Sequence, residues 1–184
     1  MIYAFSGKKQ SGKTTASAYL QEKLNATRIN FKDALLVELQ VKFPELFREL
    51  IKIYDQTAYD GWGWTARRLL NEKPPLVRAL MQNYGTNVCR ERNPDHWVDE
   101  WRKTVAQTVG TIVVDDVRFL NEAQAIRENG GTIIRIIREG LKSDDKHVSE
   151  QEMNSIEVDY TIRCAEGDLN CVYDKLDEIV TWTT

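Results

Sequence analysis

Residues 7–14, with the sequence GKKQSGKT, have the residue types and spacing of a phosphate-binding P-loop. Successive backbone N–H groups of such a loop, together with the N-terminus of the following helix, form an anion site. Lys13 would reach the β- and γ-phosphates of a nucleotide, and the Thr14 hydroxyl can ligate Mg²⁺. Gly7 and Gly12 permit close approaches that a Cβ atom would block. The pattern predicts nucleotide binding, and a simple glycine-containing turn is the alternative.

A second polar group, Asp115, Asp116 and Arg118, follows a β-branched run at residues 111–114. Ligands bind beyond the carboxyl ends of strands in parallel sheets, so we expect this group to face the same crevice as the P-loop. A carboxylate there can hold Mg²⁺ through its water shell, and an arginine can bind a phosphate through two parallel hydrogen bonds. We assign the metal to Thr14 and Asp115, although Asp116 is an alternative. A surface Asp/Arg pair of little consequence is the other interpretation.

Composition and charge narrow the class of protein. Hydrophobic residues make up 42% and charged residues 29% of the chain, as in ordinary globular proteins. The formal net charge of −3 gives no basic field of the kind that marks nucleic-acid binding. Cys89, Cys164 and Cys171 have no metal-type spacing and are odd in number, so we expect neither a disulfide framework nor a zinc site, and a reducing cytoplasm fits. The N-terminal residues predict neither secretion nor membrane insertion.

Strands and helices that must position these groups alternate along the sequence. An apolar run at residues 1–5 leads into the P-loop, and helical periodicity follows it. Alternation of this kind indicates a mostly parallel sheet covered on both faces. We therefore expect an α/β protein with the three-layer P-loop NTPase fold, forming one domain over residues 1–184. Further strands are expected at residues 26–31, 111–114, 132–137 and 160–164.

Helix signals fill the intervals between these strands. Asp33 is the predicted N-cap of a helix, Pro44 restarts it, and Asn121 with Gln124 resembles a capping box. Asp168 is predicted to cap the C-terminal helix, and residues 60–64 are predicted to form a loop with packed tryptophans.

At this level of detail the chain resembles the deoxynucleoside monophosphate kinases of bacteriophages, within the P-loop nucleoside monophosphate kinase group. The resemblance covers most of the chain. It rests on the P-loop, residues 78–86 (RALMQNYGT) with Arg90 and Trp97, residues 116–122 (DVRFLNE) and residues 147–150 (HVSE). It implies a helical monophosphate-binding insertion at residues 33–95 and a short lid at residues 138–152.

The P-loop and the resemblance together imply three sets of site residues. Solvated helix surface is the alternative for Arg78 and Arg90, core packing is the alternative for Trp97, and Lys32 with Asp33 matches the family only loosely. The predicted catalytic residues are Lys13, Asp116, Arg118 and Glu122. The predicted ATP-binding residues are Gly7, Gln10, Ser11, Gly12, Lys13, Thr14, Thr15 and Arg138. The predicted acceptor-binding residues are Lys32, Asp33, Arg78, Gln82, Thr86, Arg90 and Trp97.

The reaction implied by the resemblance is transfer of the γ-phosphoryl group of ATP, with Mg²⁺, to a deoxynucleoside 5′-monophosphate, in the host cytoplasm if the chain is phage-encoded. The acceptor needs no general base because its second pKa is about 6. Glu122, one turn beyond Arg118, could orient that guanidinium.

Two alternatives to this reaction stay open. One is a P-loop kinase for another acceptor, such as a phosphorylated isoprenoid precursor or a sugar alcohol, with Asp116 as base. The other is a nucleotide-dependent switch or binding module, although the sequence lacks an Asn-Lys-x-Asp guanine-reading motif. Base choice, sugar preference and oligomeric state, monomer or homodimer, are left undecided by the sequence.

Overall fold

The structure is a computed structural model of the 184-residue chain, and it describes residues 1–55, 65–141 and 152–183. The chain divides into two compact units. The sheet unit consists of Met1–Phe31 and Val98–Thr184, and the helical unit consists of Lys32–Trp97. No helix among the described residues is long and apolar enough to cross a membrane.

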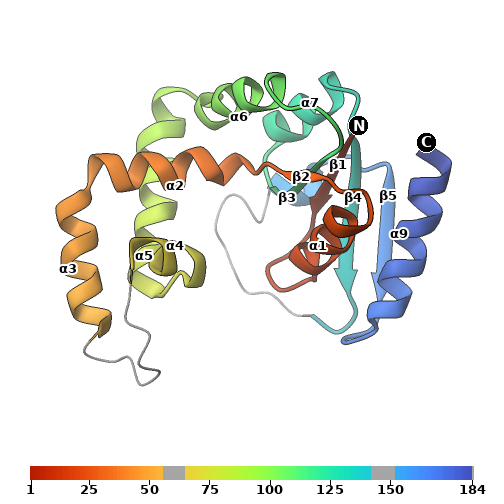
Figure 1. Cartoon of the computed structure of the whole chain (residues 1–184), viewed down its shortest axis with the longest axis horizontal. Helices are drawn as coiled ribbons and strands as arrows, with labels where there is room; N and C mark the ends of the chain where they lie inside the picture. The colour runs from red at the N-terminus through yellow and green to blue at the C-terminus, as the bar shows by residue number, and fades with distance from the viewer. Residues whose placement is uncertain (56–64, 142–151, 184) are drawn as a thin grey trace. The chain divides into compact units, whose positions relative to one another are not determined.

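The sheet unit is built on five parallel strands in the order β2-β3-β1-β4-β5 (Figure 1). This arrangement confirms the predicted parallel five-stranded sheet. The P-loop follows the central strand β1, so it emerges at the carboxyl edge of the sheet. The strands are β1 (Ile2–Ser6), β2 (Thr27–Arg28), β3 (Ile112–Val117), β4 (Thr132–Arg138) and β5 (Tyr160–Cys164).

Helices cover both faces of this sheet, which gives the three layers expected. Side chains alternate along β1, so Tyr3 and Phe5 pack on one face while Ile2 and Ala4 pack on the other. The first face lies against α1 (Lys13–Lys23) and α9 (Leu169–Thr183). The second lies against α7 (Leu120–Glu128), the 3₁₀ turn η2 (Met153–Ser155) and Trp101, which is 2% exposed.

The helical unit contains helices and no strand in its described residues, 32–55 and 65–97. Its core contains Leu39, Phe47, Leu69 and Val77, all buried. A π-helix, η1, continues directly from α5, and such segments are rare and frequently lie at functional sites. The elements are α2 (Phe31–Lys42), which starts at the last residue before the unit, α3 (Pro44–Asp55), α4 (Ala66–Glu72), α5 (Pro75–Gln82), η1 (Asn83–Arg90) and α6 (His96–Ala106), which continues into the sheet unit.

Three local expectations are wrong. The second strand pairs only over Thr27–Arg28, and α2 already begins at Phe31, so Asp33 lies within its first turn rather than at its N-cap. Helix α7 begins at Leu120, and its capping carboxylate is Glu122 rather than the side chain of Gln124. In contrast, Pro44 does begin α3, and Asp168 Oδ1 does accept a hydrogen bond from the Cys171 N–H in α9. Residues 60–64 and most of the predicted lid, residues 142–151, lie outside the described residues.

Candidate active site

The loop at residues 7–12 has the backbone geometry that its glycines predict. Gly7 has φ +146°, and a Cβ atom there would lie 2.4 Å from the carbonyl oxygen of Ile136. Gly12 has φ +101°, which is unfavourable for residues with side chains, and it immediately precedes α1. Position 7 therefore requires glycine because the loop passes close to β4, and position 12 favours glycine because its φ is positive.

Lys13 is the first residue of α1, and its side chain folds back into the loop. The ammonium nitrogen donates hydrogen bonds of 2.7 Å to the carbonyl oxygens of Gly7 and Lys8. The residue is only 8% exposed. A buried cation held on two carbonyl oxygens keeps its charge at the loop, where it can attract an anion.

Ser11 places a buried hydroxyl in the same loop. Its Oγ has no hydrogen-bond partner within the described parts of the chain. Leaving a buried hydroxyl unpaired costs free energy, so such a group favours a ligand that supplies the partner. Thr14 and Thr15 follow in the first turn of α1, and both are exposed.

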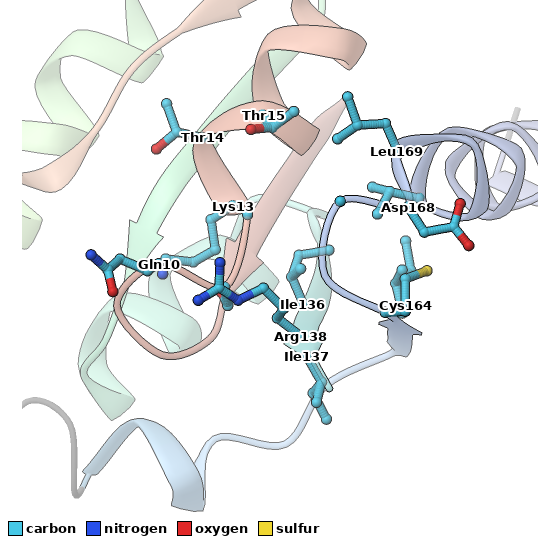
Figure 2. A pocket seen from close by; sticks show the side chains of 16 residues that line it. Gln10, Lys13, Thr14, Thr15, Ile136, Ile137, Arg138, Cys164, Asp168 and Leu169 are labelled. Carbon is cyan, nitrogen blue, oxygen red and sulfur yellow. The ribbon is translucent and has the colours of Figure 1, made fainter. Parts of the chain in front are cut away.

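A pocket of about 370 Å³ opens beside this loop (Figure 2). Figure 2 shows Gln10 and Lys13 on one side of it and Cys164, Asp168 and Leu169 on the opposite side. The P-loop residues Gln10 to Thr14, the next residue Thr15 and Arg138 line it together, so the structure brings these predicted ATP-binding residues to one cavity. The other lining residues are Ile136, Ile137, Ile162, Cys164, Ala165, Gly167, Asp168, Leu169 and Val172.

Sequence reasoning did not identify the wall formed by residues 162–172. This wall is largely apolar, and it comes from the end of β5 and the start of α9. The residues of this wall are of the types found in any protein core. Only the strand order, in which β5 lies next to β4, could have indicated that they form a pocket wall. Arg138 closes the pocket near this wall and is paired with Glu166 at 3.0 Å.

A disulfide joins Cys164 and Cys171 in this wall, with their Cα atoms 6.1 Å apart. The expectation that the three cysteines form no disulfide is therefore wrong. An odd cysteine count does not exclude a single bond: Cys89 is the free cysteine, and the other two meet because α9 starts directly after β5. The bond closes the loop at residues 165–170, four of whose residues line the pocket.

Asp115 and Asp116 were predicted to follow a strand, but they lie within β3, which extends to Val117. The register shifts here, because Ala4 pairs with Val114 and Ser6 with Val117, so two residues of β3 face one residue of β1. Such a bulge re-aims side chains and is common beside active sites. Neither aspartate lines the pocket described above, nor do Arg118 and Glu122.

Both aspartates contact residues at the start of α2 or just before it. Asp115 is 4% exposed, its backbone N–H donates to Asn30 Oδ1 at 2.8 Å, and its carboxylate lies 3.9 Å from Arg28 Nη1. The carboxylate of Asp116 accepts a hydrogen bond of 3.1 Å from the backbone N–H of Phe31. A carboxylate at a helix N-terminus is favoured by the helix dipole.

The side chain of Glu122 is buried, and it binds two backbone N–H groups. Its Oε2 accepts hydrogen bonds from the N–H groups of Arg118, at 2.8 Å, and Phe119, at 3.1 Å. It therefore caps α7 and fixes the backbone from which the half-buried Arg118 projects.

Four predicted acceptor residues recur every four positions along α5 and η1, and all four are half-buried. A π-helix turns less per residue than an α-helix, because its hydrogen bonds span five residues, so a four-residue spacing keeps side chains on one face. These residues are Arg78, Gln82, Thr86 and Arg90.

The other three predicted acceptor residues differ from these. Lys32 is half-buried and Asp33 is exposed, in the first turn of α2. Trp97 is 3% exposed, and its indole N–H donates to the Gly85 carbonyl at 3.0 Å. Burial with a satisfied N–H favours the packing role of Trp97 over a stacking contact with a base.

The parallel sheet, with a P-loop after its central strand and a pocket beside that loop, defines a protein of the P-loop nucleotide-binding class. Residues 56–176 match the family model for deoxynucleotide monophosphate kinase. The chain belongs to this deoxynucleotide monophosphate kinase family, and it is thereby a nucleoside monophosphate kinase.

Individual relatives agree with the family match. A protein of Acanthamoeba polyphaga mimivirus named "Putative deoxynucleotide monophosphate kinase" is 33% identical over 161 residues, which are 85% of this chain and 83% of that protein. The deoxynucleotide monophosphate kinase of Escherichia phage RB69 is 31% identical over 109 residues, which are 56% of this chain but only 44% of that protein. Among solved structures, dephospho-CoA kinase from Campylobacter jejuni is 15% identical with a TM-score of 0.46, over 98% of this chain and 95% of that one.

Proposed function

We propose that this chain transfers the γ-phosphoryl group of ATP to a deoxynucleoside 5′-monophosphate, giving the diphosphate. The observation that carries the proposal is the pocket beside the P-loop in a chain of this family. Lys13 lines this pocket together with Ser11, whose buried hydroxyl has no hydrogen-bond partner among the residues that the structure describes. Viral relatives support action in the cytoplasm of an infected host.

ATP would lie with its phosphates in the P-loop and its base in the pocket. The buried Ser11 hydroxyl would gain a phosphate oxygen as partner, and Lys13 would exchange its two carbonyl oxygens for phosphate oxygens. Apolar side chains such as Ile136 and Val172 suit the faces of a base, and Arg138 can stack on it or bind a phosphate.

Mg²⁺ fits the oxygen donors that the sheet unit offers. Thr14 presents an exposed hydroxyl in the first turn of α1, and Asp115 is a carboxylate in a hydrogen-bonded bulge. When bound, the ion would neutralise negative charge on the phosphates of the donor. Asp115 would hold it through water, because its carboxylate is buried beside Arg28.

The acceptor monophosphate requires recognition and charge neutralisation rather than a base. A phosphate monoester has a second pKa of about 6, so the attacking oxygen is already deprotonated at neutral pH. The half-buried face of Arg78, Gln82, Thr86 and Arg90 offers two guanidinium groups and two neutral polar groups to an anionic nucleotide. Arg118 would neutralise charge on the transferred group.

A coupled assay of ADP release, run with ATP and a panel of deoxy- and ribonucleoside monophosphates, tests this proposal. Turnover should require a monophosphate and should be highest with a deoxynucleotide. Lys13→Ala should abolish turnover, whereas Lys9→Ala, a change at an exposed lysine of the same loop, should leave it intact. Equal ADP release with and without a monophosphate would show an ATPase and overturn the proposal.

A further inference from the structure

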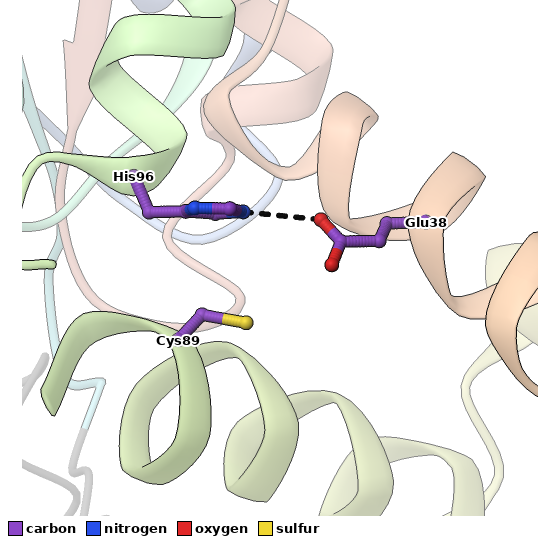
Figure 3. Close-up of side chains that lie close together, drawn as sticks. All are labelled: Glu38, Cys89 and His96. Carbon is purple, nitrogen blue, oxygen red and sulfur yellow. Dashed lines mark hydrogen bonds and ion pairs between the residues drawn. The ribbon is translucent and has the colours of Figure 1, made fainter. Parts of the chain in front are cut away.

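Three side chains of the helical unit with metal-binding atoms gather at one place (Figure 3). They are Glu38 of α2, Cys89 of η1 and His96 at the start of α6, and their ligand atoms all lie within 4.8 Å of one another. Figure 3 shows the imidazole directed at the Glu38 carboxylate, with the Cys89 sulfur on one side of that contact. The distance from His96 Nε2 to Glu38 Oε2 is 3.0 Å.

The local backbone brings these residues together from distant positions. Cys89 lies near the end of the π-helix, and a tight turn follows in which the Asp95 N–H donates to Asn93 Oδ1 and the His96 N–H to the Asn93 carbonyl. This turn directs the first residue of α6 back over η1. Its imidazole is further fixed by an edge-to-face contact with Trp97, with ring centroids 4.4 Å apart.

Glu38 is an ionised and well-oriented ligand. Although partial burial acts to raise the pKa of this carboxyl, hydrogen bonds from Lys42, Tyr84 and His96 lower it to about 2. Tyr84 donates to Oε1 at 2.6 Å, and Lys42 pairs with the same oxygen. Oε2, which faces His96, is therefore the oxygen available to an ion. Outer partners of this kind commonly orient metal ligands.

We propose that Glu38, Cys89 and His96 bind a single zinc ion through Oε2, Sγ and Nε2, with water as the fourth ligand. This mixture of thiolate, imidazole and carboxylate suits zinc, whereas Mg²⁺ and Ca²⁺ select oxygen ligands only. Tetrahedral zinc sites separate their ligand atoms by roughly 3.3–3.8 Å, as follows from bonds of about 2.0–2.3 Å, so small side-chain movements suffice.

Binding replaces the hydrogen bond between His96 and Glu38 with two metal bonds. His96 Nε2 gives up to solvent the proton that it shares with Glu38, and the imidazole binds as the neutral ring protonated at Nδ1. The Cys89 thiol also loses its proton to solvent, and the thiolate forms the third bond. The side chains of His96 and Glu38 are 32% and 20% exposed, which gives an ion a route from solvent, while Cys89 is 8% exposed. The site lies wholly within the helical unit, and it does not depend on the proposed reaction.

Cysteine spacing could not have predicted this site. Only one of its ligands is a cysteine, and the carboxylate is 51 positions earlier in the sequence than that cysteine. The three helices that supply the ligands would be tied together by the ion. We therefore expect bound zinc to raise the temperature of unfolding of the protein.

The test uses cobalt(II) as the spectroscopic probe and the full chain as the protein. The buffer contains no thiol reductant, so Cys164 and Cys171 stay in their disulfide and Cys89 is the free thiol. One equivalent of Co²⁺ should produce a thiolate-to-cobalt charge-transfer band, and Zn²⁺ should abolish the band by displacement. Cys89→Ser should remove the band, and His96→Gln and Glu38→Gln should weaken Co²⁺ and Zn²⁺ binding by at least about tenfold.

Matched controls sharpen the test. Glu45→Gln, at an exposed glutamate of α3, and His147→Gln, at the only other histidine, should bind both ions as the unsubstituted chain does. A hydrogen-bonded cluster without metal affinity would give no band. That result, or a band that survives Cys89→Ser, overturns the proposal.

Discussion

The carboxylate of Glu122 lies 2.8 Å from the backbone nitrogen of Arg118 and accepts its N–H. The relationship between these residues is therefore through the backbone: the glutamate fixes the segment from which the arginine projects. A second hydrogen bond, from the Phe119 N–H, makes the same oxygen the cap of α7. We therefore propose that Glu122 is a positioning residue, which holds the backbone at Arg118 rather than contacting phosphate itself.

Glu122→Ala should lower both stability and kcat. Loss of a helix cap costs about 0.5–2 kcal/mol, and the two freed N–H groups no longer hold Arg118 in place. Glu122→Gln should recover much of both, because the amide oxygen can still accept. Urea unfolding and steady-state kinetics measure the two effects, with Glu128→Gln, at an exposed position of α7, as the control. Equal damage from glutamine and alanine would instead indicate that the charge itself contacts the reacting groups.

Reduction of the Cys164–Cys171 disulfide should loosen the nucleotide pocket. The bond closes a loop of only a few residues, worth on the order of 2 kcal/mol in chain entropy. We expect dithiothreitol to lower the temperature of unfolding and to raise KM for ATP, with KM for the monophosphate unchanged. Cys171→Ser should show the same values without reductant and no response to it. A reductant effect that persists in Cys171→Ser would assign it to another group.

Glu38 should make the stability of the protein sensitive to acid. Its pKa is lowered from 4.5 to about 2 in the folded chain, so its stabilising effect is full above the unfolded-state pKa and is lost as pH falls from about 4.5 through 2. After allowance for solvent screening, ionised Glu38 contributes on the order of 1–2 kcal/mol to the free energy of unfolding. Urea unfolding with EDTA at pH 6 and pH 3 measures it. Glu38→Gln should lose less stability over this interval than the unsubstituted chain or Glu45→Gln.

Features set by short-range chemistry were predictable from the sequence. The P-loop needs glycines at two backbone positions and a lysine at the helix start. The residues directly before and after the loop show the patterns of a strand and a helix. Strand alternation with helices similarly predicted the parallel sheet.

Features that depend on tertiary neighbours were not predictable. The bulge at Asp115 and Asp116 exists because β3 must keep pairing with β1 up to Val117, which no local pattern encodes. Trp97 is buried with its indole N–H bound to the carbonyl oxygen of Gly85, a partner on another helix that the periodicity of its own helix does not specify. The pocket wall at residues 162–172 consists of ordinary apolar residues and gains a role only through the order of the strands.

Arg118→Lys should lose most of kcat with the fold unharmed. Lysine keeps the positive charge but lacks the planar, two-pronged donor geometry that matches a phosphate. If Arg118 contacts the transferred group, its interaction strengthens as charge spreads over the equatorial oxygens, and the loss appears in kcat as well as KM. If it only anchors the monophosphate in the ground state, KM alone rises.

Steady-state kinetics with ATP and the best monophosphate decides between these two roles of Arg118. The comparison takes the unsubstituted chain, Arg118→Lys and Arg118→Ala, with Arg127→Lys as the control, since Arg127 lies exposed on α7, the helix that follows Arg118, and pairs with Asp159. Thermal unfolding should be similar in all four, because the Arg118 backbone N–H, which binds Glu122, is retained in each. Near-normal kcat in both Arg118 variants would remove this residue from the catalytic set and leave residues 116–122 with a structural role only.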